Sequence, residues 1–195
     1  RPDDHFGSGV VVIGDLDGDQ VVDLAVGADR TDDDRKGAGA VWVLFLNRDG
    51  TVKGHQKISA RHGGFSGRIR KWDRFGYDLS ALGDLDGDGI LDLCVGMRKD
   101  DQDVGKHNKG TNKGAIWLLF LNRDGTVRGH QKINGIQGGL NGALNRGDQF
   151  GMSIALLPDF TGNGLPELVV GANRDNDGGK DRGSVWLLFP ERKEI

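Results

Sequence analysis

The sequence predicts an all-β protein, and three observations carry that prediction. The chain has 195 residues, of which 34 are glycine, about 17% where ordinary proteins have roughly 7%. Its apolar runs are short, about 5 to 7 residues, rich in Val, Ile, Leu and Trp and bounded by Gly, Asp and Asn. Such runs are typical of strands and too short for helices. The pattern also recurs with a period of about 70 residues, which indicates a repeat architecture.

Three units open at the same dipeptide, and each carries an aspartate nine residues after its phenylalanine. The dipeptides are Phe6-Gly7, Phe75-Gly76 and Phe150-Gly151, and the aspartates are Asp15, Asp84 and Asp159. We therefore divide the chain into units 1–59, 60–134 and 135–195. The first unit predicts strands at 8–13, 23–28, 40–46 and 51–58, and the second at 77–82, 92–96, 115–121 and 126–133. The third predicts strands only at 152–157, 167–172 and 184–189, with its last strand missing.

Consecutive strands are expected to pair antiparallel, because the link Asn47-Arg48-Asp49-Gly50 fits a short hairpin. The second and third strands of each unit are nearly continuous apolar runs, which predicts burial on both faces of each small sheet. Sheets of this kind stack radially as the blades of a β-propeller. Trp42, Trp117 and Trp186 recur in the third strand and are predicted to lie between blades.

Three blades are too few to close a ring, which usually needs about four to eight. The chain begins with Arg1, so we expect either further blades in a longer chain or self-association, slightly favouring self-association. Two copies would supply six blades, and the unpaired edge of the third unit would accept a strand from elsewhere. No apolar run is long enough to cross a bilayer, so membrane insertion is not expected.

The link between the first and second strands is the most specific chemical signal in the chain. Each of the first two loops carries four carboxylates within nine residues, and such crowding is repulsive unless a cation neutralises it. Calcium takes six to eight oxygen ligands, and acids at loop positions 1, 3, 5 and 9 with the position-7 carbonyl supply most of them. The predicted calcium ligands are Asp15, Asp17, Asp19, Val21 and Asp23, and Asp84, Asp86, Asp88, Ile90 and Asp92.

The third loop departs from this pattern. Its ligand candidates are Asp159, Thr161, Asn163, Leu165 and Glu167, so two neutral side chains replace carboxylates and a weaker calcium site is expected. An EF-hand is excluded, because that motif needs a glutamate at position 12 and flanking helices, whereas valine stands there in all three units. The competing interpretation is an acid-rich turn that binds no metal.

The motifs together resemble FG-GAP repeats, which build the amino-terminal β-propeller of integrin α subunits. The resemblance rests on the Phe-Gly openings, the acidic loops, Val26-Gly27-Ala28, Val170-Gly171-Ala172 and the later Gly-x-Val/Ile-Trp strand; the second unit departs at Met97. It implies an extracellular or cell-surface protein whose acidic loops bind calcium on one face of the propeller. Ligands would be engaged on the opposite face, by residues 29–39, 98–114 and 173–183 with 59–74 and 134–149.

No set of residues outside the repeat pattern converges as an acid, base or nucleophile would, so we do not expect an enzyme. His55, His130 and Cys94 are interpreted as structural. The strongest feature outside the repeat is Trp72, which lies among Arg68, Arg70, Lys71 and Arg74. Such a group is compatible with binding an acidic glycan or peptide, or with capping the end of a blade. The net charge of −3 argues against nucleic acid as a partner.

The sequence therefore favours a calcium-binding module for adhesion to protein or glycan. The alternatives are a self-assembling scaffold without external ligand and a propeller enzyme acting on polysaccharide. The enzyme would require two close carboxylates outside the acidic loops.

Overall fold

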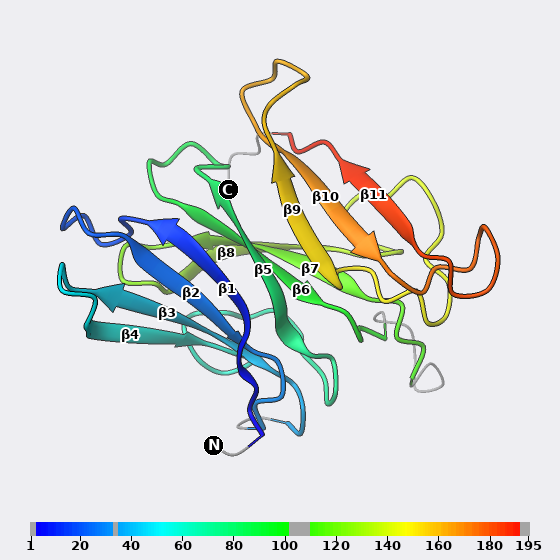
Figure 1. The fold of residues 1–195 in the computed structure, drawn as a ribbon, viewed down its shortest axis with the longest axis horizontal. Helices are drawn as coiled ribbons and strands as arrows, with labels where there is room; N and C mark the ends of the chain where they lie inside the picture. Colours follow the sequence, from blue (N-terminus) through cyan, green and yellow to red (C-terminus); the bar gives the residue numbers. More distant parts are fainter. Residues whose placement is uncertain (1–2, 33–34, 102–109, 192–195) are drawn as a thin grey trace.

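The computed structural model describes residues 3–32, 35–101 and 110–191, which form eleven strands and contain no helix. The strands make three antiparallel sheets, as predicted (Figure 1). Within the described ranges there is accordingly no apolar helix of membrane-spanning length.

The first sheet consists of β1 (Phe6–Gly14), β2 (Asp23–Ala28), β3 (Ala40–Leu46) and β4 (Val52–Ile58). The second consists of β5 (Phe75–Gly83), β6 (Asp92–Met97), β7 (Ala115–Leu121) and β8 (Val127–Ile133). The third consists of β9 (Ser153–Leu157), β10 (Glu167–Ala172) and β11 (Ser184–Leu188).

The predicted strands are confirmed, with corrections of one or two residues at their ends. The main difference is that β1 and β5 begin at Phe6 and Phe75, two residues before the predicted starts. In both strands the register shifts directly after the phenylalanine, and the following Gly7 and Gly76 have positive φ angles of 94° and 82°. This irregular stretch interrupts the alternation of apolar residues, so the sequence pattern alone starts each strand too late.

The three sheets lie face to face, with their first strands β1, β5 and β9 beside one another (Figure 1). One apolar core fills the space between the first and second sheets and includes Val41 and Leu119; another fills the space between the second and third and includes Leu118 and Val170. In the second sheet every residue of β6 and β7 is buried. The prediction that these strands are covered on both faces is therefore confirmed for the sheet that has a neighbour on each side.

Glycine allows the backbones of neighbouring sheets to approach closely. A Cβ atom built on Gly27 would lie 2.0 Å from the carbonyl oxygen of Gly76, and one on Gly96 would lie 2.3 Å from that of Gly151. Two isolated parallel bridges add hydrogen-bonded contact between sheets, joining Gly39 to Phe75 and Gly114 to Phe150. A side chain at these positions would push the sheets apart, so part of the glycine content is a requirement of sheet stacking.

The recurring tryptophans differ in burial according to the neighbours of their sheet. Trp117 is only 4% exposed and packs edge-on against Phe65, with ring centroids 5.0 Å apart, as predicted for a residue between blades. Trp42 in the first sheet and Trp186 in the third are half-buried. Trp42 is less covered because its face of the first sheet has no preceding sheet in the described structure.

The third sheet has three strands in the order β11-β10-β9, so β11 is an edge where the other two sheets carry a fourth strand. The predicted absence of a last strand in this unit is thus confirmed for the described residues; residues 192–195 lie outside them. The arrangement matches the blades of a propeller, and the ring is not closed within this chain.

Substituting Gly27 by alanine tests whether close backbone approach holds the sheets together. We expect Gly27→Ala to lower the free energy of unfolding by about 2 kcal/mol, because the added methyl meets the Gly76 carbonyl. Gly54→Ala is the matched control: Gly54 also lies inside a strand, and its added methyl would meet only the Phe45 ring at 3.7 Å. Urea denaturation should show Gly54→Ala within about 0.5 kcal/mol of the wild type. Equal losses in the two variants would contradict the role of close approach.

Candidate metal centres

The three acidic loops occupy equivalent places, each joining the first and second strands of its sheet. The short hairpin between the third and fourth strands lies at the same end of the sheet, because consecutive strands are antiparallel. Each complete sheet therefore brings an acidic loop close to the beginning of its own fourth strand. This placement decides which side chains meet the carboxylates.

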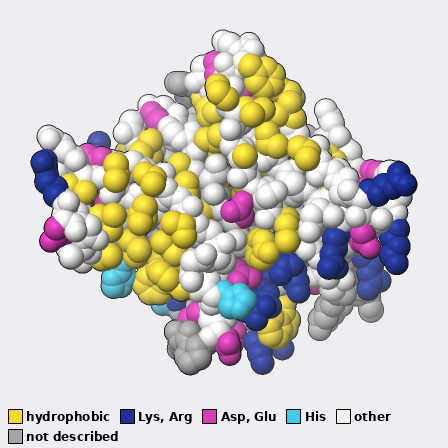
Figure 2. Space-filling model, in the orientation of Figure 1, with side chains coloured by type: hydrophobic (Ala, Val, Ile, Leu, Met, Phe, Trp, Pro, Cys, Tyr) yellow, Lys and Arg dark blue, Asp and Glu magenta, His cyan; other side chains and the backbone are white. Residues whose placement is uncertain are grey.

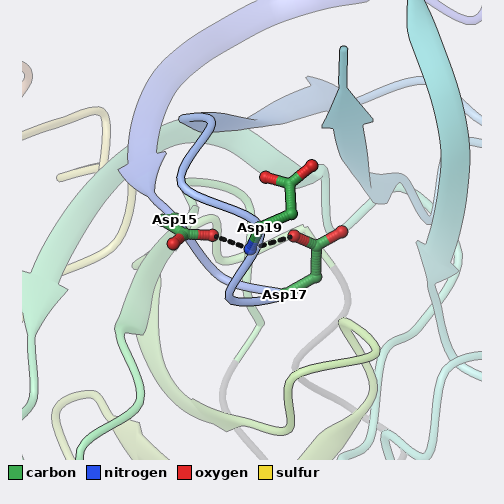
Figure 3. A group of neighbouring side chains, drawn as sticks. All are labelled: Asp15, Asp17 and Asp19. Carbon is green, nitrogen blue, oxygen red and sulfur yellow. Dashed lines mark hydrogen bonds between the residues drawn. The ribbon is translucent and has the colours of Figure 1, made fainter. Parts of the chain in front are cut away.

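In the first loop the carboxylates fold inward over the turn (Figure 3). Asp15 accepts hydrogen bonds from the backbone N–H groups of Gly18 at 2.8 Å, Asp19 at 2.9 Å and Gln20 at 2.9 Å. Asp17 accepts a longer one, 3.3 Å, from the same Asp19 N–H. The structure thereby gathers one carboxylate oxygen from each of Asp15, Asp17 and Asp19 within 4.8 Å of one another.

The second loop repeats this geometry. Asp84 accepts hydrogen bonds from Gly87 N at 2.7 Å and Gly89 N at 2.9 Å, and Asp88 accepts one from Ile90 N at 2.8 Å. Asp84, Asp86 and Asp88 form a triad of oxygens within the same 4.8 Å limit. Two independent segments of the chain thus converge on the same carboxylate arrangement.

A basic side chain from the fourth strand meets each triad, and sequence reasoning missed both. Lys53 Nζ lies 2.7 Å from Asp17 Oδ2 and also pairs with Asp19, and Arg128 Nη2 lies 2.7 Å from Asp88 Oδ2 and also pairs with Asp86. The hydrogen bonds that Lys53 donates to Asp17 and Asp19 raise the pKa of Lys53, and the bond to Asp19 lowers the pKa of that carboxyl group. The signal available in the sequence was the equivalent position of the two residues, directly after Val52 and Val127.

The position-9 acids, Asp23 and Asp92, lie apart from the triads. Asp23 is fully buried and accepts hydrogen bonds from Leu16 N and Leu46 N, both at 3.0 Å. Asp92 does the same with Leu85 N and Leu121 N, and burial raises its pKa to about 7. These carboxylates tie the acidic loop to the third strand, and each oxygen keeps a second lone pair for another partner.

The third loop is more self-contained. Asp159 accepts hydrogen bonds from Gly162 N and Gly164 N at 2.7 Å, and the Gly164 bond is the largest cause of its lowered pKa. Thr161 donates its hydroxyl proton to Glu167 at 2.7 Å, and the Asn163 amide donates to the Pro190 carbonyl. In the described ranges no lysine or arginine pairs with Asp159 or Glu167, because the third sheet has no fourth strand to supply one.

The two triads have the composition and spacing to hold a metal cation. Ligand oxygens at about 2.3–2.6 Å from a calcium ion lie at most about 5 Å from one another, and the three oxygens of each triad lie within 4.8 Å, although Lys53 and Arg128 now pair with two carboxylates of each. All the side-chain donors are hard oxygens, and the position-7 residues Val21 and Ile90 have only backbone carbonyls to contribute. The donor set therefore suits a hard divalent cation.

The opposite ends of the sheets carry the predicted basic cluster around Trp72. Trp72 is 40% exposed, and its ring lies so close to Gly37 that a Cβ built there would be 2.2 Å from a ring carbon. Arg74, Lys36 and Lys71 lie 5.3, 5.5 and 5.7 Å from the ring centroid. Lys36 enters from the neighbouring loop and was not part of the predicted cluster. Residues 33–34 and 102–109 of the predicted ligand loops lie outside the described structure.

His55, His130 and Cys94, which the sequence analysis interprets as structural, lie in packed surroundings. His55 packs beside Trp42 and His130 beside Trp117, with ring centroids 5.2 and 5.1 Å apart. Cys94 is a fully buried free thiol, and burial raises its pKa. A protonated thiol inside the core is a poor nucleophile, consistent with packing.

Comparison with known proteins agrees with the fold and the loops. Stacked antiparallel sheets of three or four strands with acidic loops define a propeller-type repeat protein, and the FG-GAP repeat model matches residues 6–44 and 150–188. The chain is 31% identical to integrin alpha-5 of Xenopus laevis over 173 residues, 86% of this chain and 15% of that protein. It is 31% identical to integrin alpha-PS2 of Drosophila melanogaster over 189 residues, 95% of this chain and 12% of that protein. The chain thus contains FG-GAP repeats and is similar to part of the integrin α subunits, and it spans only a small part of the length of these relatives.

The buried acids can be separated experimentally from the triads. Asp23→Ala should lower the free energy of unfolding by about 2–4 kcal/mol in chelator, because two backbone N–H groups lose their acceptor. Asp17→Ala, which removes only one 3.3 Å hydrogen bond and a solvent-exposed ion pair, should stay within about 1 kcal/mol of the wild type. Urea unfolding in EDTA measures both values. A smaller loss for Asp23→Ala than for Asp17→Ala would contradict this division.

Proposed function

We propose that this chain is a calcium-binding propeller module that engages a protein or glycan ligand, as part of an extracellular or cell-surface adhesion protein. The observation that carries the calcium proposal is the pair of equivalent carboxylate triads in successive sheets. The similarity to integrin α subunits supports the adhesion role and the location. Each of the units 1–59, 60–134 and 135–195 would then act as one blade.

The proposed ligand set follows the loop positions. The first two sites use the triad carboxylates with the carbonyls of Val21 and Ile90, and Asp23 and Asp92 at loop position 9 are their remaining proposed ligands, which the structure holds outside the triads. The third proposed site is weaker, with Asp159 and Glu167 as its only charged ligands beside Thr161, Asn163 and the Leu165 carbonyl. A bound calcium ion would supply positive charge and coordination that brace the loop, which is a structural role.

Lys53 and Arg128 partly neutralise the negative charge of the triads in the absence of metal, so a calcium ion must compete with them. An ammonium or guanidinium group brings one positive charge, whereas a calcium ion brings two and coordinates several oxygens at once. We expect metal binding to release Asp17 and Asp19 from Lys53. The basic residue would keep the loop folded when calcium is scarce, at the expense of calcium affinity.

The ligand would bind at the other end of the sheets, where Trp72 is exposed among three cations. An indole face stacks on a sugar ring, and neighbouring cations favour carboxylate or sulfate groups. This combination supports an acidic glycan or acidic peptide as the ligand class. A scaffold that binds no external ligand is the alternative, and it would leave the exposed Trp72 without a role; a polysaccharide-acting enzyme is the less favoured one.

Calcium should stabilise the folded chain. At calcium 100-fold above its dissociation constant, one site adds about 2.7 kcal/mol, which corresponds to a melting-temperature rise of roughly 5–10 °C for a chain of this size. The double variant Asp17→Asn/Asp86→Asn should lose most of that rise, because it removes one carboxylate from each triad. Calorimetry with calcium and with EDTA measures it.

The control for the calcium experiment is Asp49→Asn. Asp49 lies in the hairpin next to the first loop and bonds Thr51, outside the triad, so this variant should keep the full calcium-dependent rise. A wild-type melting temperature that is the same in calcium and in EDTA would refute the calcium proposal.

Ligand binding should depend on Trp72. We expect Trp72→Ala to weaken binding to acidic glycans by at least tenfold, because the stacking surface for three cations and a sugar ring disappears. An array of sulfated, carboxylated and neutral glycans, probed in calcium, measures the preference. Trp42→Phe, at a half-buried tryptophan on a sheet face, serves as the control and should bind like the wild type. Equal binding of neutral and acidic glycans would contradict the assigned ligand class.

A further inference from the structure

The two ends of the stack of sheets expose apolar faces. The leading face is the side of the first sheet that faces away from the second, and it exposes Phe6, Val10 and Val12 by 59%, 60% and 55%. The trailing face is the side of the third sheet that faces away from the second, and it exposes Val185 and Leu187 by 73% and 41%. Hydrophobic side chains gather over β1 to β3 at the left of Figure 2.

The repeat shows what covers each face in the interior of the molecule. Phe6 is equivalent to Phe75 and Phe150, which are completely buried between sheets. Val10 is equivalent to Leu79, which is 5% exposed because the first sheet covers it. The leading face is therefore the same surface that, in the second and third sheets, packs against the sheet before it.

The residues of the trailing face are equivalent to residues of the first and second sheets that are covered by the following sheet. Val185 and Leu187 are equivalent to Val41 and Val43, both fully buried against the second sheet. They are also equivalent to Ile116 and Leu118 of the second sheet, which are 0% and 5% exposed against the third. The two exposed faces are thus the two halves of one interface that this chain already forms twice.

Gly171 gives an independent indication. Its equivalents Gly27 and Gly96 must be glycine because the backbone of the next sheet, at Gly76 and Gly151, lies 2.0 and 2.3 Å from a built Cβ. The three atoms nearest to a Cβ on Gly171 all belong to Ser153 of its own sheet, the nearest being the hydroxyl oxygen of that rotatable side chain at 2.2 Å, and Gly171 does not have a positive φ. The equivalent approach for Gly171 is by Gly7, which has no atom within 4 Å of a built Cβ.

We propose that the trailing face of one copy of this chain packs on the leading face of a second copy, in the manner of the two internal sheet interfaces. Gly7 of the second copy would approach Gly171, and Phe6 would bridge to Gly183 as Phe75 bridges to Gly39. The contact is head-to-tail, so two copies that make it reciprocally form a closed set of six sheets, within the range of known propellers.

The first test is the mass of the chain in solution, measured by light scattering in calcium and in EDTA. We expect twice the 21.0 kDa of one chain. Phe6→Asp damages only the leading face and Leu187→Asp only the trailing face, so each variant alone should lose the reciprocal dimer. Ile136→Asp, at a residue that is 52% exposed in the loop after β8 and away from both faces, should remain dimeric.

Mixing the two variants distinguishes head-to-tail packing from a face that pairs with itself. Phe6→Asp keeps an intact trailing face and Leu187→Asp an intact leading face, so the mixture should form a heterodimer through one contact. Circular dichroism establishes that each variant is folded before it is mixed. A wild-type chain that is monomeric and unfolds cooperatively would overturn the proposal, and so would a Phe6→Asp variant that stays dimeric.

Discussion

A sheet that is apolar on both faces must be covered on both faces, and this constraint organises the molecule. The second sheet meets it fully, since β6 and β7 are buried throughout between two neighbours. The first and third sheets meet it on one side only. Stacking also requires the sheets to approach at the backbone, which explains why glycines recur inside the second strands at Gly27 and Gly96. Hydrophobic burial supplies the stabilisation, and glycine supplies the fit.

The same architecture decides the electrostatics of the acidic loops. In the first two sheets the fourth strand brings Lys53 or Arg128 to the carboxylates, so a cation of the same sheet partly neutralises the acidic loop. The third sheet has no fourth strand among the described residues, and its loop has two neutral side chains, Thr161 and Asn163, in place of acids. Less charge in the loop and fewer cations beside it therefore occur together. The missing cation follows from the missing strand, and the neutral side chains reduce the mutual repulsion that a loop without that counter-charge would have.

Much of this could be predicted from the sequence because the repeat presents the same information three times. Strand identity, hairpin pairing and the acidic triads followed from local patterns at equivalent positions. Contacts between segments distant in the chain did not. Lys53 meets Asp17 only because the hairpin folds back beside the acidic loop, and Lys36 meets Trp72 only because two loops of neighbouring sheets cross. The early start of β1 was missed because a bulge breaks the alternation on which strand prediction depends.

The proposed metal sites and the proposed ligand surface lie at opposite ends of the sheets, so their roles can be considered separately. The triads lie at one end of the second strand and the Trp72 cluster at the other, and a six-residue strand such as β2 spans about 20 Å. At that distance a bound cation interacts weakly with a ligand through a screened solvent. Any effect of the cation on ligand binding must therefore be transmitted through the packed sheets, which fix the positions of the strand ends and of their loops. In the proposed function, a calcium ion at the triads would therefore act on binding only through the order of the sheets, while Trp72 and its neighbouring cations would contact the ligand directly.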